Sequence, residues 1–180
     1  WEGSDEGDGY SSPHLYTING VKQILLSSAN GLVSLDPKNG NELWNYNWEV
    51  DSRIVQPAIC DNGDIIITRG SGESLRRISI SEKSGKYTSE DVWASSGMKV
   101  NFNDMIIHEG YLYGYEGMKL VCVDLEDGSR KWKQGRYGGQ ILLLEEQDLL
   151  IVLTEKGELA LVEADPAEFN ELQNIPAIEG

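Results

Sequence analysis

A sequence motif recurs in this chain at a regular interval, and it constrains the fold more than any other feature. Residues 35–44 (LDPKNGNELW) and 123–132 (VDLEDGSRKW) each carry aspartate, glycine four residues later and tryptophan four residues after that. Trp44 and Trp132 lie 88 residues apart, which is two periods of 44. A period of about 40–45 residues is typical of β-propellers, in which each blade is a sheet of four strands.

Two weaker copies of the motif fill the remaining periods. One has Gly85 and Trp93 with extra residues before the tryptophan, and the other has Leu172 near the tryptophan position. We therefore expect an all-β chain of about four propeller blades, each built from four antiparallel strands. The expected blades span residues 12–48, 56–93, 102–134 and 139–175 of a propeller region 12–180. The structural motif residues are Asp36, Gly40, Trp44, Gly85, Trp93, Asp124, Gly128 and Trp132.

Turn pairs and short apolar runs support the same fold class. Asn-Gly occurs at residues 19–20, 30–31, 39–40 and 62–63, and residues 127–128 form an equivalent Asp-Gly pair. Such pairs favour type I′ turns between antiparallel strands. Runs such as Ile65–Ile67 and Leu120–Val123 are apolar at consecutive positions, which predicts strands buried on both faces. Sheets stacked around an axis bury both faces, whereas two flat sheets bury only one face each.

Two segments depart from the strand pattern. Residues 165–168 (DPAE) combine a capping aspartate with proline and glutamate, which predicts a single helical turn. Residues 1–11 are acidic and glycine-rich, and we expect a linker or the end of a preceding blade. A calcium site in residues 2–9 is the alternative, although the twelve-residue calcium-loop pattern is missing there.

Charge and cysteine content exclude several classes of partner. The chain has 15 basic and 30 acidic residues, a net charge of −15, which argues against binding to nucleic acid or to anionic lipid. No apolar run approaches the roughly 20 residues of a membrane helix, so direct membrane insertion is not expected. Cys60 and Cys122 lie in apolar strand contexts, which favours buried free thiols over the one conceivable bridge.

Candidate catalytic or binding residues are few. His14 and His108 are 94 residues apart, which argues against a histidine-rich metal site and favours structural or surface roles for both. Tyr111, Tyr113 and Tyr115 share one face of a strand; we expect them to pack between blades, with an aromatic binding surface as the alternative. We predict no catalytic, cofactor-binding or metal-binding residue.

The motif spacing resembles the tryptophan-docking repeat of the PQQ-like (quinoprotein-type) β-propellers. Residues 9–13 (GYSSP) and 31–36 (GLVSLD) are similar to the bacterial PQQ-binding-like repeat proteins, a group that includes the outer-membrane protein assembly lipoprotein. The resemblance covers nearly the whole chain and implies a ring of seven or eight blades. We therefore expect part of a larger propeller, completed by further blades of a longer chain or by self-association, with a self-closed four-bladed ring as the alternative.

The resemblance also implies a function. It predicts a non-enzymatic scaffold for protein partners in a bacterial periplasm or cell envelope, or a secreted one. Quinoprotein relatives hold a quinone with calcium, a catalytic aspartate and a disulfide between adjacent cysteines. Because Cys60 and Cys122 are far apart in sequence, we expect no cofactor here. A fragment of a quinoprotein-type oxidoreductase and a carbohydrate-binding propeller are the alternatives.

Overall fold

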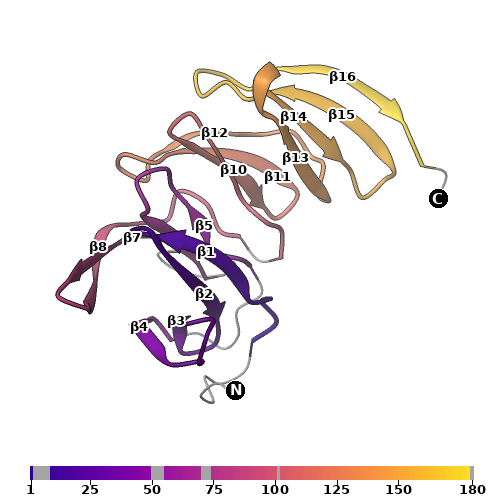
Figure 1. The fold of residues 1–180 in the computed structure, drawn as a ribbon. Helices are drawn as coiled ribbons and strands as arrows, with labels where there is room; N and C mark the ends of the chain where they lie inside the picture. The colour runs from indigo at the N-terminus through magenta and orange to yellow at the C-terminus, as the bar shows by residue number, and fades with distance from the viewer. Residues whose placement is uncertain (2–8, 50–54, 70–73, 101, 179–180) are drawn as a thin grey trace. The chain divides into compact units, whose positions relative to one another are not determined.

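The computed structural model describes residues 1, 9–49, 55–69, 74–100 and 102–178. It confirms the predicted fold class, because the described residues form four sheets, each of four consecutive antiparallel strands (Figure 1). We call them blades 1 to 4 in chain order. The expected linker and the alternative calcium site fall almost entirely on residues 2–8, outside the described residues. Among the described residues, no helix has the length and apolar character needed to cross a bilayer.

The chain divides into two compact units, which we describe separately. The first unit contains blades 1 and 2. The strands of blade 1 are β1 (His14–Ile18), β2 (Val21–Ser27), β3 (Gly31–Leu35) and β4 (Glu42–Asn47). The strands of blade 2 are β5 (Ala58–Ile59), β6 (Ile65–Thr68), β7 (Leu75–Lys83) and β8 (Lys86–Ser95).

The second unit contains blades 3 and 4. The strands of blade 3 are β9 (Ile106–His108), β10 (Tyr111–Glu116), β11 (Lys119–Asp124) and β12 (Arg130–Gln134). The strands of blade 4 are β13 (Gln140–Leu144), β14 (Leu149–Leu153), β15 (Glu158–Glu163) and β16 (Glu171–Pro176), with a short 3-10 turn (Glu145–Gln147) after β13.

The turn pairs adopt two different geometries. Asn19 and Gly20 both have positive φ, as a type I′ turn requires. At the other four pairs only the glycine has positive φ, so the type I′ prediction is wrong there. The reason is visible at residues 39–40, where Asn39 Oδ1 accepts a hydrogen bond of 2.9 Å from the backbone N–H of Asn41. With this side-chain hydrogen bond, Asn39 shapes the turn without adopting positive φ.

The core of the first unit lies between blades 1 and 2. Blade 1 contributes large side chains, including Trp44 and Tyr46, and blade 2 contributes a set of isoleucines. The isoleucines are Ile65, Ile67, Ile78 and Ile80. The blades therefore meet with one aromatic-rich face against one aliphatic face.

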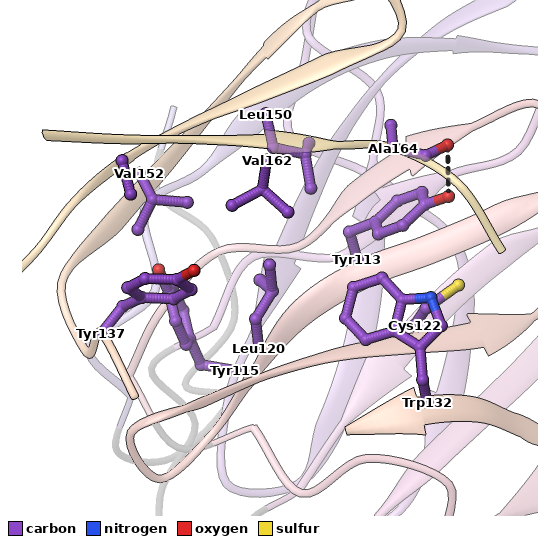
Figure 2. Packing of buried hydrophobic residues seen from close by; sticks show 11 residues of the cluster. Tyr113, Tyr115, Leu120, Cys122, Trp132, Tyr137, Leu150, Val152, Val162 and Ala164 are labelled. Atoms are coloured by element: carbon purple, nitrogen blue, oxygen red, sulfur yellow. Dashed lines mark hydrogen bonds between the residues drawn. The ribbon is translucent and has the colours of Figure 1, made fainter. Parts of the chain in front are cut away.

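The core of the second unit has the same plan (Figure 2). Blade 3 contributes Tyr113, Tyr115, Leu120, Cys122 and Trp132, which lie against blade 4. Blade 4 contributes smaller side chains to the same core, namely Leu150, Val152, Ala160 and Val162. All four of these are at most 1% exposed, so this face of blade 4 is removed from water.

The tyrosines of β10 pack between blades, as predicted. Tyr113 and Tyr115 are 0% and 1% exposed, which rules out the alternative that they form an accessible binding surface. On the opposite face of β10, a Cβ added to Gly114 would lie 3.0 Å from the sulfur of Met98. The glycine therefore allows the close approach that the sequence suggested.

Residues 165–168 do not form the expected helical turn. Asp165 does accept a hydrogen bond of 2.7 Å from the backbone N–H of Ala167, but the segment continues as bends and irregular structure into β16. A single capped turn has no helix to follow it here, because residues 171–176 pair with β15 instead. Helix nucleation without propagation is unfavourable, so the sheet pairing wins.

Candidate functional site

The repeated aspartate and glycine of the motif shape equivalent turns in blades 1 and 3. Asp36 Oδ1 accepts a hydrogen bond of 2.8 Å from Lys38 N–H, and Asp124 Oδ1 accepts one of 2.9 Å from Glu126 N–H. Gly40 and Gly128 both have φ of 74°, a conformation that favours glycine. In blade 2, Gly85 instead follows Ser84 in a two-residue hairpin turn in which both residues have positive φ. The weak second copy of the motif thus has a different turn.

The repeated tryptophans lie on the fourth strand of their blades. Trp44 is 4% exposed, and its Nε1–H donates a hydrogen bond of 2.7 Å to Oε1 of the buried Gln23 in the same blade. Trp132 is 8% exposed, and its Nε1–H donates one of 2.8 Å to the backbone carbonyl of Asp165 in the next blade. Trp93 lies on β8 and is half-buried.

Blade 3 positions one loop of blade 4 through two such bonds. Besides the bond from Trp132 to Asp165, the Tyr113 hydroxyl donates a hydrogen bond of 2.9 Å to the carbonyl of Ala164 (Figure 2). Phe169 stacks edge-on against the Trp132 ring, with ring centroids 5.6 Å apart. The segment after β15 is therefore fixed by side chains of the blade core.

This segment forms one wall of an acidic pocket with a cavity volume of about 400 Å³. The pocket lies in the second unit, where the turns that precede β10 and β14 meet the segment after β15. Its lining contains four carboxylates and no lysine or arginine. The carboxylates belong to Glu109, Asp148, Glu163 and Asp165.

His108 lies behind one of the carboxylates of the acidic pocket and contacts it. Its side chain is 7% exposed, and its Nε2 lies 2.8 Å from Asp148 Oδ1. Ligand atoms of His108, Glu109 and Asp148 all lie within 4.8 Å of one another. Imidazole nitrogen with carboxylate oxygens is a donor set that binds divalent transition metals, so these three residues could hold such an ion. The same carboxylates can instead bind lysine or arginine side chains.

Sequence reasoning assigned His108 a structural or surface role and did not identify the acidic pocket. The available signal was the repeat itself, because Tyr111 and Leu149 begin the second strands of successive blades. Turns at equivalent places in adjacent blades lie close together, so Glu109 and Asp148 could have been paired. His14 contacts Tyr16 in the same strand, with its Nδ1 3.1 Å from the tyrosine hydroxyl.

The cysteines are free and buried, as predicted. Burial raises the pKa of Cys60 to about 11 and that of Cys122 to about 12. They lie in different blades, beside β5 and on β11. They therefore do not supply the adjacent-cysteine disulfide that the quinoprotein alternative requires.

Comparison with known proteins agrees with the blade geometry. A family model for the outer membrane protein assembly factor BamB matches residues 1–134. A comparison with curated protein sequences finds no significant match.

Several solved structures share the fold. BamB from Moraxella catarrhalis is 16% identical, with a TM-score of 0.55 over 84% of this chain and 48% of its own. A protein of unknown function from Desulfotomaculum acetoxidans is 14% identical, with a TM-score of 0.64 over 91% and 56%. The computationally designed Ika8 protein is 9% identical, with a TM-score of 0.61 over 94% and 50%. The chain thus spans about half the length of these structures, and by its family match it belongs to the family of the outer membrane protein assembly factor BamB.

Proposed function

We propose that this chain is part of a non-enzymatic protein-interaction scaffold, located in a bacterial periplasm or cell envelope or secreted. We further propose that its acidic pocket binds a basic segment of a protein partner. Family membership supports interaction with proteins in general. The observation that carries the specific proposal is the lining of the pocket, which combines Glu109, Asp148, Glu163 and Asp165 with no basic side chain.

The chemistry favours a cationic ligand. Glu109 and Asp148 are exposed, so a partner side chain can reach their carboxylates without unfolding the turns. Lysine and arginine form charge-assisted hydrogen bonds with carboxylates, and the protein's charge of −15 speeds the approach of a basic partner. Because Trp132 and Tyr113 fix the opposite wall, little ordering is needed when the partner binds.

A lysine-rich decapeptide tests this proposal by calorimetry in buffer that contains a chelator. We expect saturable binding with one peptide per chain, and at least a tenfold loss of affinity in the double variant Glu109→Gln/Asp148→Asn. The matched control Glu126→Gln/Asp127→Asn removes two exposed charges from a different turn of blade 3 and should change affinity less than twofold. An equal loss in both double variants would show non-specific attraction to an acidic protein and contradict the proposal.

A divalent cation is a second candidate ligand, because His108 adds a nitrogen donor to the cluster. Titration with Mn²⁺ or Zn²⁺ in chelator-free buffer separates the two candidates. His108→Gln should weaken metal binding and leave peptide binding intact, since the imidazole is buried behind Asp148.

A further inference from the structure

The acidic pocket and the metal-donor cluster of the second unit share two carboxylates. Glu109 and Asp148 belong to the lining of the pocket, and together with His108 they place one ligand atom each within 4.8 Å of one another. The other two lining carboxylates, those of Glu163 and Asp165, lie outside this cluster. A ligand that occupies the oxygens of Glu109 and Asp148 therefore leaves only half of the pocket's carboxylates for a second ligand.

The chain's own cations do not neutralise the pocket. Among the described residues, no lysine or arginine forms an ion pair with Glu109, Asp148, Glu163 or Asp165. Glu109 is exposed and the side chain of Asp148 is 65% exposed, so a cation from solution can reach both carboxylates. Repulsion among unneutralised carboxylates favours the binding of such a cation.

His108 distinguishes this cluster from an ordinary group of surface acids. Its side chain is only 7% exposed, and its Nε2 faces Asp148 Oδ1 at 2.8 Å. Imidazole nitrogen is a donor that Zn²⁺ binds readily, whereas Mg²⁺ and Ca²⁺ prefer oxygen ligands alone. Adjacent donors of a tetrahedral zinc ion lie about 3.4 Å apart, so a movement of about an ångström by the exposed Glu109 and Asp148 side chains gives that spacing.

Backbone hydrogen bonds hold the two turns that carry the donors. The carbonyl of Asp148 accepts a hydrogen bond of 2.8 Å from the N–H of Ala164. The carbonyl of Gly110, in the turn that follows His108, accepts one of 3.0 Å from the N–H of Leu125. The donors thus project from a fixed backbone, which lowers the ordering cost of binding an ion.

We propose that a divalent transition metal such as Zn²⁺ binds to His108, Glu109 and Asp148 and thereby prevents the basic segment from binding in the acidic pocket. This inference rests on the proposed function, because it concerns the regulation of that binding. The ion occupies two of the four carboxylates, and its two positive charges offset half of the negative charge of the lining. Since the effect of two ligands on each other is reciprocal, the basic segment weakens metal binding by the same factor.

Calorimetry with an acetylated lysine-rich decapeptide and protein without a histidine tag tests this competition. Zn²⁺ is first titrated alone, and we expect one ion per chain. With free Zn²⁺ at about ten times its own dissociation constant, the apparent dissociation constant of the peptide should rise about tenfold over its value in chelator, as simple competition requires. Mg²⁺ at the same concentration is the control for screening by salt, and it should change the peptide's affinity less than twofold.

The chain's two histidines provide a matched pair of variants. His108→Gln should reduce the effect of Zn²⁺ on peptide affinity to less than twofold, whereas His14→Gln, in β1 of blade 1, should preserve the tenfold effect. Because His108 is buried, a second measurement leaves it in place. In the His14→Gln protein the one remaining imidazole is that of His108, and its ring-proton NMR signals should shift or broaden when Zn²⁺ is added.

The outcomes separate this inference from the proposed function. Equal peptide affinity with and without Zn²⁺, or a His108 signal that does not respond to the ion, would overturn the regulation and leave the peptide site standing. A zinc effect that survives His108→Gln would also overturn it, because the ion would then bind elsewhere. A peptide that fails to bind in chelator would contradict the proposed function, and the regulation would fall with it even if His108 responds to Zn²⁺.

Discussion

Tyr113 and Tyr115 allow a matched test of one buried hydrogen bond. Both tyrosines point from β10 into the core of the second unit and are almost fully buried (Figure 2). The Tyr113 hydroxyl donates to the carbonyl of Ala164 at 2.9 Å, but the Tyr115 hydroxyl has no hydrogen-bond partner among the described residues. Burial raises the pKa of both side chains, so each keeps its proton and remains a donor at neutral pH.

The expected magnitudes follow from this difference. Tyr113→Phe leaves the Ala164 carbonyl without its donor, which should lower the free energy of unfolding by about 1–2 kcal/mol. Tyr115→Phe removes a polar group that lost its water contacts without gaining a partner, so stability should stay unchanged or rise by up to about 1 kcal/mol. The two variants should therefore differ by roughly 2 kcal/mol, although the substitution and the strand are the same.

Urea unfolding followed by tryptophan fluorescence measures both values. Because the chemical change is identical, effects on the unfolded chain cancel in the comparison. If Tyr115→Phe destabilises the protein as much as Tyr113→Phe, the Tyr115 hydroxyl has a partner such as an internal water, and the reasoning fails.

Three further predictions concern packing, backbone and charge. Trp44→Ala and Trp132→Ala should each lower the free energy of unfolding by about 3–5 kcal/mol in chemical denaturation. Trp1→Ala should lower it far less, because Trp1 is 60% exposed. Small losses at all three positions would refute the docking role of the repeated tryptophans. Gly139→Ala should lower the free energy of unfolding by more than about 1 kcal/mol, because φ is 89° and a Cβ would overlap the Leu153 carbonyl oxygen. Gly85→Ala should lower it less, because the space around an added Cβ is open there. Burial opposes ionisation of Glu116, but the hydrogen bond from Lys133 and the charge of Arg130 outweigh it and lower its pKa. The stability that Glu116 contributes should be complete above its ordinary value of 4.5 and fade as the pH falls through the lowered pKa, so Glu116→Gln should cost more at pH 7 than at pH 3.

The fold could be predicted because the repeat and the blade core are the same physical feature. Trp44 and Trp132 recur at a constant spacing since each occupies one position of the fourth strand and packs on the following blade. Apolar runs such as Leu120–Val123 indicated burial of both faces, and the structure buries all four residues. Turn geometry was less predictable, because the choice between left-handed asparagine and a side-chain hydrogen bond depends on the length of the loop.

The fourth blade shows where a spacing argument reaches its limit. Counting residues from Trp132 placed Leu172 near the tryptophan position. The register of the strands gives the position itself to Gln173, which pairs with Leu161 just before a bulge, as Trp132 pairs with Cys122. A shift of one residue along a strand moves a side chain to the other face of the sheet, so an error of one position is enough to assign the wrong residue. The loop between β15 and β16 sets this register, and its length differs from that of the equivalent loops in blades 1 and 3.

The acidic pocket could not be predicted in the same way, because the repeat does not specify its residues. Glu109 and Asp148 lie in turns where any residue that tolerates positive φ is accepted, and both have positive φ. Glu163 and Asp165 lie at the start of the loop between β15 and β16, whose position depends on bonds from Tyr113 and Trp132, two residues of the blade core. The core thus fixes where the carboxylates lie, whereas the repeat leaves their identity free. Under the proposed scaffold function, we expect specificity to vary through the residues of the turns while the tryptophans stay the same.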